Sequence, residues 1–497
     1  MQNEKSKRLF VSNYDDKKWD RVFEIDREIK EPLNISEIEN GIILPLRVRE
    51  DIKALDEAYE GGVCDENFAF VSGLRRDYVK ENANLSVGRS YTVPKDELKK
   101  YEETVVFGGI LFDHFGHFLT HSTVRVWWHS ENPDSEYRFV FLYNNLLQKP
   151  GIDRYPEEFF DLIGLPRERI LIVQEPSQFK KVIVPEEACY ILTRASRKWL
   201  LPFEDAKRYV SENLSPSSYR KIYLSRTHYT KYGKCDGINE EYYEKFFERR
   251  GYQIIYPEEY SLAQQINILM HAEDIVCTFG SLTHMIMFAN DGVRHTSIIR
   301  TPELWIHQAV INAVRKPDWY WVEGTINPLP TSHDQGYFLY TPTVWFRNYL
   351  DSEGIPYEEE ELSPALPSKD MVWEYIVNWT MHFSDPSYSS QIKDKTAMDF
   401  LRALKQALFG EEIAPEAIRT TKTADALKAE KIKTEELQKQ LKEQAKIQEK
   451  YKKSIHELIA ERDQYKERLE KTQSSVSWKM TKPLRGAHEM LKNSGKK

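Results

Sequence analysis

Three histidines stand close together in the segment VVFGGILFDHFGHFLTHSTVR, residues 105–125. His114, His117 and His121 recur at i, i+3 and i+7, the spacing of one face of a helix. Imidazole nitrogens accept and donate protons near neutral pH, and they also bind metal ions. Asp113 adds a carboxylate directly before them. The segment therefore predicts one edge of an active site. A satisfied core histidine is the alternative interpretation of His114.

A zinc site is a second interpretation of the same histidines. His117 and His121 have the HxxxH spacing of some metalloproteases. Phe118 stands where such an enzyme carries its glutamate, and the sequence offers no further cluster of ligands. We therefore do not predict a metal site.

Short apolar runs place the histidines after a buried strand. Residues 105–112 predict that strand, interrupted by two glycines. From about residue 35 to 203, apolar runs alternate with polar helical stretches, the rhythm of βα units around a mostly parallel sheet. Residues 219–299 repeat this pattern and include an amphipathic helix predicted over 259–271. Two α/β blocks in series predict two Rossmann-like domains that face each other across a cleft.

Composition excludes several classes of protein. Seventy basic and 78 acidic residues give a net charge of −8, which argues against a general nucleic-acid-binding protein. Four cysteines without a CxxC pair predict reduced, buried thiols. The sequence shows no apolar signal segment and no run near the ~18 apolar residues of a membrane span. We therefore expect a cytosolic protein.

The sequence changes character after about residue 349. An acidic, proline-containing stretch precedes two predicted helices, 370–383 and 396–409. Residues 421–473 contain neither proline nor glycine, and their apolar residues follow a heptad pattern with polar interruptions. Two interpretations stay open for this segment: a coiled coil that makes a homo-oligomer, and a solvated single helix.

Several sequence motifs occur in an order that resembles that of the family 61 glycosyltransferases. They include GGVCDENFAFVSG, FGGILFDHFGHFLTHSTVRVW, KIYLSRTHYT and CTFGSLTHMIMF. Many members of this family are labelled capsular polysaccharide biosynthesis proteins, and the resemblance covers about residues 40–300. It implies a GT-B fold and an inverting transfer without a metal cofactor. It also implies that the second domain holds a nucleotide-sugar donor, while the first contributes the acceptor side and the base.

On the acceptor side, the resemblance points to the histidine segment. His117 lies in the family's Gly-His-Phe-Leu word and is the leading candidate for the base. His121 replaces an acid that often follows in the family, so His121 and Asp113 stay open as alternatives. Arg125 keeps its family place and is predicted to hold an acidic acceptor or a phosphate, with His114 nearby.

On the donor side, Arg226 ends the word KIYLSR, where a guanidinium can bond two phosphate oxygens; a surface ion pair is the alternative. Gly280 and Ser281 follow a strand and open a predicted helix, whose free N–H groups suit a pyrophosphate. His284 matches the family's Gly-Ser-x-x-His-Asn word, although methionine replaces the asparagine.

Three further residues match family words on the donor side, and two of them have structural alternatives. Asn239 and Glu240 stand together, and Glu240 can instead be a first-turn acid of a helix. Gln265 can instead be a helix-surface residue.

The C-terminal word SVSWKMTKPLR resembles the tail of many bacterial polysaccharide glycosyltransferases. The last 24 residues carry six cations and one acid beside apolar residues. Such a segment can lie on an anionic membrane surface, and a disordered basic tail is the alternative. We therefore predict a cytosolic protein with peripheral contact at the inner face of the membrane.

The prediction is thus an inverting glycosyltransferase of surface polysaccharide or glycoconjugate assembly, with a glycan or lipid-linked acceptor. A non-catalytic scaffold that oligomerises through its coiled coil is the alternative. The predicted segments are an N-terminal extension (1–34), the acceptor and base domain (35–210), the nucleotide-sugar domain (211–349), an acidic linker with helices (350–420), the coiled coil or long helix (421–473) and the basic tail (474–497).

Overall fold

The computed structural model describes part of the chain. The described residues are 8–12, 26–48, 59–74, 87–112, 114–143, 154–228, 237–301, 305–327, 329, 337–362, 367–384 and 401. The chain divides into two units, 1–413 and 414–497, and every described residue lies in the first. The predicted coiled coil (421–473), the basic tail (474–497), most of the helix predicted over 396–409, and Asp113 lie outside the described residues.

The second α/β block builds a six-stranded sheet in which all neighbours run parallel. Four of its strands stand where the apolar runs predicted them. A two-residue strand from the N-terminal extension adds an edge. In spatial order the strands are β1 (Leu9–Phe10), β18 (Asp318–Glu323), β17 (Arg294–Ile299), β16 (Asp274–Thr278), β13 (Lys221–Leu224) and β15 (Gln253–Ile255).

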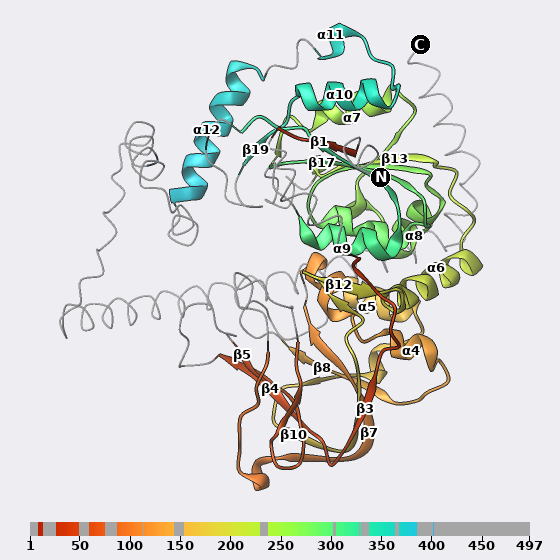
Figure 1. The fold of residues 1–497 in the computed structure, drawn as a ribbon, viewed down its shortest axis with the longest axis vertical. Coiled ribbons are helices and arrows are strands. Elements are labelled where there is room, and N and C mark those ends of the chain that lie inside the picture. Colours follow the sequence, from red (N-terminus) through yellow and green to blue (C-terminus); the bar gives the residue numbers. More distant parts are fainter. Residues whose placement is uncertain are drawn as a thin grey trace, which may run out of the picture. The chain divides into compact units, whose positions relative to one another are not determined.

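Helices cover both faces of this sheet. Helices α7 (Glu241–Glu248) and α10 (Val344–Ser352) lie on one face, and α8 (Leu262–His271) and α9 (Ile306–Arg315) lie on the other (Figure 1). Side chains alternate along a strand, so Tyr223 of β13 packs in the aromatic cluster of α7 and α10 while its neighbours face α8 and α9. Helix α8 confirms the helix predicted over 259–271.

The first block builds a mixed sheet of eight strands. The strands β10 (Ser177–Pro185), β7 (Lys99–Leu111), β8 (Arg138–Tyr143) and β9 (Ile170–Val173) run parallel. The strands β3 (Ile35–Glu39), β4 (Ile42–Val48), β5 (Tyr59–Cys64) and β6 (Phe70–Ser72) pair antiparallel. The prediction of a mostly parallel sheet is therefore wrong for its N-terminal half. Parallel neighbours need a long crossover, which the five residues between the paired strands β5 and β6 do not provide.

The remaining helices and strands are short or peripheral. They are β2 (Glu28–Ile29), α3 (Phe115–His117), α4 (Trp127–Glu131), α5 (Arg154–Leu162), β11 (Cys189–Tyr190), β12 (Arg194–Ser196), α6 (Leu201–Asn213), β14 (Gly237–Ile238), β19 (Phe338–Leu339), α11 (Glu359–Leu362) and α12 (Lys369–Ser384). Helix α12 contains the helix predicted over 370–383. It packs on β19 through Tyr375, Trp379 and Phe383.

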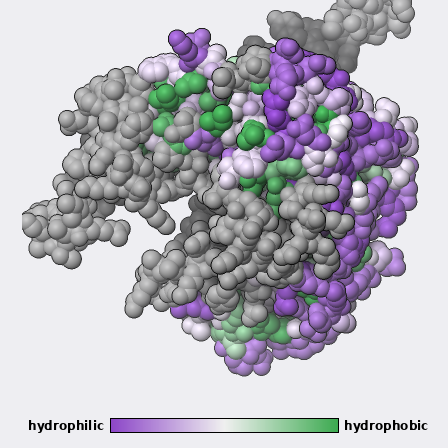
Figure 2. Space-filling model, turned by 45° about the horizontal axis from the view of Figure 1, so that its top comes forward, coloured by the Kyte–Doolittle hydropathy of each residue, from purple (hydrophilic) through white to green (hydrophobic). Residues whose placement is uncertain are grey.

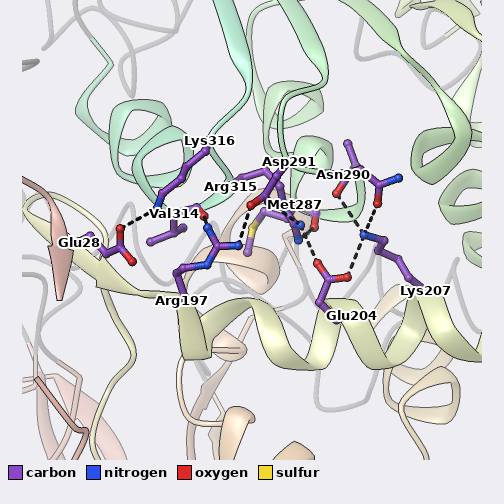
Figure 3. Close-up of polar contacts among 11 residues, drawn as sticks. Glu28, Arg197, Glu204, Lys207, Met287, Asn290, Asp291, Val314, Arg315 and Lys316 are labelled. Atoms are coloured by element: carbon purple, nitrogen blue, oxygen red, sulfur yellow. Dashed lines mark hydrogen bonds and ion pairs between the residues drawn. The ribbon is translucent and has the colours of Figure 1, made fainter. Parts of the chain in front are cut away.

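Charged side chains tie α6 to the elements of the second sheet (Figure 3). Lys207 donates to the carbonyl of Ala289 at 3.3 Å, and burial lowers its pKa. The buried Arg315 donates to the carbonyl of Met287 and pairs with Glu204 at 2.6 Å. Cations at the carboxyl ends of helices are favourable because the helix dipole is negative there. This network fixes α6 against the segment that follows β16.

The surface and the thiols agree with the composition. Cys64, Cys189 and Cys277 are free and buried, which confirms the prediction for three of the four cysteines; Cys235 lies outside the described residues. On the face drawn in Figure 2, the described surface is mostly hydrophilic, with hydrophobic side chains in scattered groups. A search of the described helices for a candidate membrane span finds none.

Replacing Arg315 tests the α6 network. Arg315→Leu is expected to lower the free energy of unfolding by about 2–4 kcal/mol, because the Met287 carbonyl and the Glu204 carboxylate lose a buried donor. Arg208→Leu is the matched control, since Arg208 is exposed and pairs with Asp205 on the same helix. Urea unfolding measures both variants. Equal midpoints for the two would show that the network contributes no more than a surface ion pair.

Candidate functional site

The three histidines form a row between β7 and α4. Helix α3 is followed directly by a π-helix, Phe118–Ser122. The ring centroids of His114 and His117 lie 5.0 Å apart, and those of His117 and His121 lie 5.1 Å apart. His114 is exposed, His117 is half-buried, and only 2% of His121 is exposed. The core interpretation of His114 is therefore wrong, because the row runs from the surface at His114 inward to His121.

A π-helix carries His121, the inner end of the row. Such turns are frequent at functional sites. The Thr120 hydroxyl donates to the Gly116 carbonyl at 2.8 Å and lies 2.7 Å from Nδ1 of His121. Since a hydroxyl has one proton, Nδ1 of His121 is the donor in the second contact. A neutral His121 ring then carries its lone pair on Nε2.

Two arginines meet one glycine at the carboxyl edge of the second sheet. Arg226 follows β13, Gly280 follows β16 and Arg300 follows β17, and these three strands are neighbours. A Cβ atom added to Gly280 would lie 2.9 Å from Nη1 of Arg226 and 3.3 Å from Nη2 of Arg300. Gly280 has a φ of +143°, a conformation that favours glycine. The edge therefore gathers two guanidinium groups around a backbone position whose conformation favours glycine.

Arg300 is not among the residues predicted from the sequence. A signal was available, because Arg300 ends the apolar run HTSIIR as Arg226 ends KIYLSR. Parallel strands bring their carboxyl ends to one edge, so two arginines at equivalent positions of nearby strands lie together. Arg300 is 6% exposed and stacks over the ring of Phe338 at 4.6 Å.

The histidine row packs directly against the glycine edge. A Cβ atom on Gly116 of α3 would lie 2.7 Å from Oγ of Ser281 and 3.6 Å from Cε1 of His114. Ser281 begins the segment Ser281–Phe288, which forms a 3-10 helix instead of the predicted α-helix. The structure thus brings together His114, His117, His121, Gly280, Ser281 and Arg226 from the predicted set.

His284 lies on the same 3-10 helix and is buried. Its Nδ1 lies 3.0 Å from Oε1 of Gln308, whose amide nitrogen donates to Asn312. Nδ1 of His284 is therefore the donor to Gln308. Burial lowers the pKa of His284 to about 4, and the charge of His114 acts in the same direction. His284 is consequently neutral near pH 7 and supports the segment behind Ser281.

Glu240 is buried beneath the arginine that follows β13. Its Oε1 accepts hydrogen bonds from the Tyr223 hydroxyl at 3.3 Å, the Arg226 backbone N–H at 3.2 Å and the Thr278 hydroxyl at 3.1 Å. Burial raises the pKa of Glu240 to about 7, while the charge of Arg226 acts to lower it. Glu240 precedes α7, but these contacts make it more than a first-turn helix acid.

Asn239 and Gln265 bind the protein backbone. Nδ2 of Asn239 donates to the Tyr340 carbonyl at 2.9 Å, and its φ is +71°. Nε2 of Gln265 donates to the carbonyl of Pro257 at 2.7 Å, and the residue is 3% exposed. The helix-surface interpretation of Gln265 is therefore wrong. These bonds give each amide a structural role. Contacts of Asn239 and Gln265 with a nucleotide-sugar donor therefore stay predictions.

Arg125 lies in a different environment from Arg226. Nη1 of Arg125 pairs with Glu187 at 3.0 Å, and both side chains are 3% exposed. Its Nη2 donates to the Ser72 hydroxyl and the Gly73 carbonyl, each at 2.9 Å, and its Nε donates to Pro185 at 3.0 Å. The predicted contact of Arg125 with an acidic acceptor therefore has to compete with partners inside the fold.

Within the described part of the chain, no group of three His, Cys, Asp or Glu residues is placed to hold a metal ion. Asp113, which directly precedes His114 in the sequence, lies outside the described residues. Independence from a metal accordingly stays a prediction.

A family model matches the part of the chain that builds this site. The model described as Glycosyltransferase 61 matches residues 115–299. The match begins at the first residue of α3 and ends at the last residue of β17, so Arg300 is the next residue. No curated protein matches the chain.

The buried carboxyl predicts a pH-dependent stability. The folded protein holds the Glu240 proton up to about pH 7, whereas the unfolded chain releases it near 4.5. Stability from this group is therefore lost as the pH rises through that window. Relative to Glu240→Gln, the free energy of unfolding of the wild type is expected to fall by on the order of 2–3 kcal/mol between about pH 5 and 8. Urea unfolding at each pH measures this.

Glu248→Gln, on the exposed side of α7, is the control and is expected to follow the wild type. Parallel profiles for the wild type and Glu240→Gln would contradict the raised pKa.

Proposed function

We propose that this chain, which belongs to the glycosyltransferase 61 family over residues 115–299, transfers a sugar from a nucleotide-sugar donor to a glycan or lipid-linked acceptor with inversion. The family match makes the protein a glycosyltransferase. The proposal for its site rests on one observation, the convergence of Arg226 and Arg300 on Gly280 beside the histidine row.

The two arginines supply the charge that a diphosphate leaving group needs. A charge-assisted hydrogen bond contributes about 1.5–3 kcal/mol, and the contribution grows where negative charge accumulates in the transition state. We place the pyrophosphate against the backbone of Gly280 and Ser281, between the guanidinium groups of Arg226 and Arg300. Two cations at this position support transfer without a metal ion.

His117 is the group we propose as the base. It is half-buried in the middle of the row, whereas His121 is 2% exposed and less open to an acceptor hydroxyl. In the reaction, the acceptor oxygen forms a bond to C1 of the sugar as its proton moves to His117, and the bond from C1 to the diphosphate oxygen breaks. His121 and Asp113 stay the alternatives.

The two sheets support a GT-B arrangement, which we also propose. The six-stranded parallel sheet would hold the donor, and the mixed sheet would present the acceptor through the loop that follows β7. Surface polysaccharide or glycoconjugate assembly is the proposed pathway, with the protein in the cytosol and in contact with the membrane through residues 474–497. A homo-oligomer through residues 421–473 belongs to the same proposal.

Nucleotide binding tests the donor site. Arg226→Ala and Arg300→Ala are each expected to weaken the affinity for the preferred nucleotide among UDP, GDP, dTDP and CMP by about tenfold to a hundredfold. Arg220→Ala is the matched control, because the exposed Arg220 stands before β13, at the opposite end of the strand. Calorimetric titration, with and without EDTA, gives the affinities.

Binding that disappears with EDTA would overturn the metal-independent proposal. Absence of binding for every nucleotide would favour the scaffold alternative.

Removing His117 tests the base. His117→Ala is expected to lower the rate of transfer by about 10²–10⁴-fold, because no group then takes the hydroxyl proton. Nucleotide affinity should stay at the wild-type value, and added imidazole should restore part of the activity. Product formation at saturating donor measures the rate. Full activity of His117→Ala would contradict the assignment of His117 as the base and would favour His121 or Asp113 in that role.

A further inference from the structure

A cavity of about 310 Å³ lies beside the end of β10, in the first sheet. Its walls include Pro185, Glu186 and Glu187, which end and follow β10, and Ser72 and Gly73, which end and follow β6. The neighbour of β10 is β7, which leads into the histidine row. The volume lies at the lower end of small-molecule sites, as a single sugar ring requires.

The cavity joins the histidine row through Arg125. This residue lines the cavity and stands four positions after His121, in the turn that follows the π-helix. The same short segment therefore carries the deepest histidine and part of the cavity wall.

The charged groups of the wall are two carboxylates and one guanidinium. Arg125 donates its Nε and both Nη2 hydrogens to carbonyl and hydroxyl oxygens of the fold, and its Nη1 pairs with Glu187. Nη1 is also buried, so little of the guanidinium is left for a ligand. Glu186 adds a second negative charge, so the wall as a whole carries a net charge of about −1.

The wall also offers oriented acceptors and aromatic rings. Oε2 of Glu186 accepts from the backbone N–H and the side-chain amide of Asn34, each at 2.9 Å, which fixes the carboxylate. A fixed carboxylate accepts hydrogen bonds from sugar hydroxyls. The rings of Phe70 and Tyr190 add apolar surface of the kind that packs on a sugar ring face.

We propose that this cavity binds the terminal sugar of the acceptor and selects an uncharged sugar over an acidic one. The inference rests on the proposed function for the meaning of the ligand as an acceptor. It replaces the expectation that Arg125 holds an acidic acceptor, because the charge of Arg125 is neutralised by Glu187 and the second carboxylate repels an anion.

Two neighbouring residues of β3 provide a matched pair of variants. Ser36 lines the cavity, whereas Ile35 does not, because successive side chains of a strand point to opposite faces. Both are exposed, so a tryptophan at either position adds the same bulk at low cost to folding. Ser36→Trp fills the cavity, and Ile35→Trp leaves it open.

The test is saturation-transfer NMR of the full chain with methyl glucoside, methyl N-acetylglucosaminide, methyl galactoside and methyl glucuronide. At least one neutral glycoside is expected to give a signal that Ser36→Trp abolishes and Ile35→Trp preserves, while the glucuronide gives none. Absence of any signal, an equal signal in both variants, or preferential binding of the glucuronide would overturn the proposal.

Nucleotide titration of the same two variants separates this inference from the proposed function. Both variants are expected to bind the nucleotide as the wild type does, because β3 belongs to the mixed sheet and Gly280 follows a strand of the parallel sheet. Glycoside binding without nucleotide binding would support the cavity as a sugar site and contradict the transferase proposal. Nucleotide binding without glycoside binding would support the transferase proposal and contradict the sugar site.

Discussion

Two guanidinium groups converge on one glycine at the edge of the parallel sheet, and the rest of the site packs around that point. Glu240 lies buried at the end of the same sheet and accepts a hydrogen bond from the backbone N–H of Arg226. Burial raises the pKa of Glu240 to about 7, while the charge of Arg226 acts to lower it. In our proposal, a diphosphate binds between Arg226 and Arg300 and interacts with both guanidinium groups.

The same edge is coupled to the histidine row by direct packing. Gly116 leaves room for Ser281, so α3 and the segment after Gly280 lie in contact. On another side, α6 is held by Lys207 and Arg315, whose charges meet the carbonyls that end helical segments. In our proposal, transfer depends on the distance between the arginines and the histidine row, and these contacts hold that distance.

Arg125 shows how a cation can serve the fold in place of a ligand. A buried guanidinium is tolerated only with a full set of partners, and Glu187, Ser72, Gly73 and Pro185 provide that set. Its partners come from β6 and β10, which places the residue in a wall. In our proposal, recognition at that wall rests on hydroxyl groups of the ligand, because Glu187 neutralises the charge of Arg125.

The sequence by itself determined the local features of this protein. Alternating and apolar runs locate β7, β13, β16 and β17, the Ser261 to Gln264 capping box starts α8, and the family words identify the segment that carries the histidines and Gly280. These features depend on neighbours within about ten residues, which is the range over which periodicity and turn chemistry act.

Only the tertiary structure decided which side chains meet. Topology decides the antiparallel pairing within the strands β3, β4, β5 and β6 and their neighbour β10. It also decides the burial of His121. The approach of Arg300 to Arg226 and the ion pair of Arg125 with Glu187 depend on topology in the same way. Arg125 and Glu187 are 62 positions apart, and Arg226 and Arg300 are 74 apart. Burial and charge compensation at such separations depend on the order of strands in a sheet, and no local pattern encodes that order.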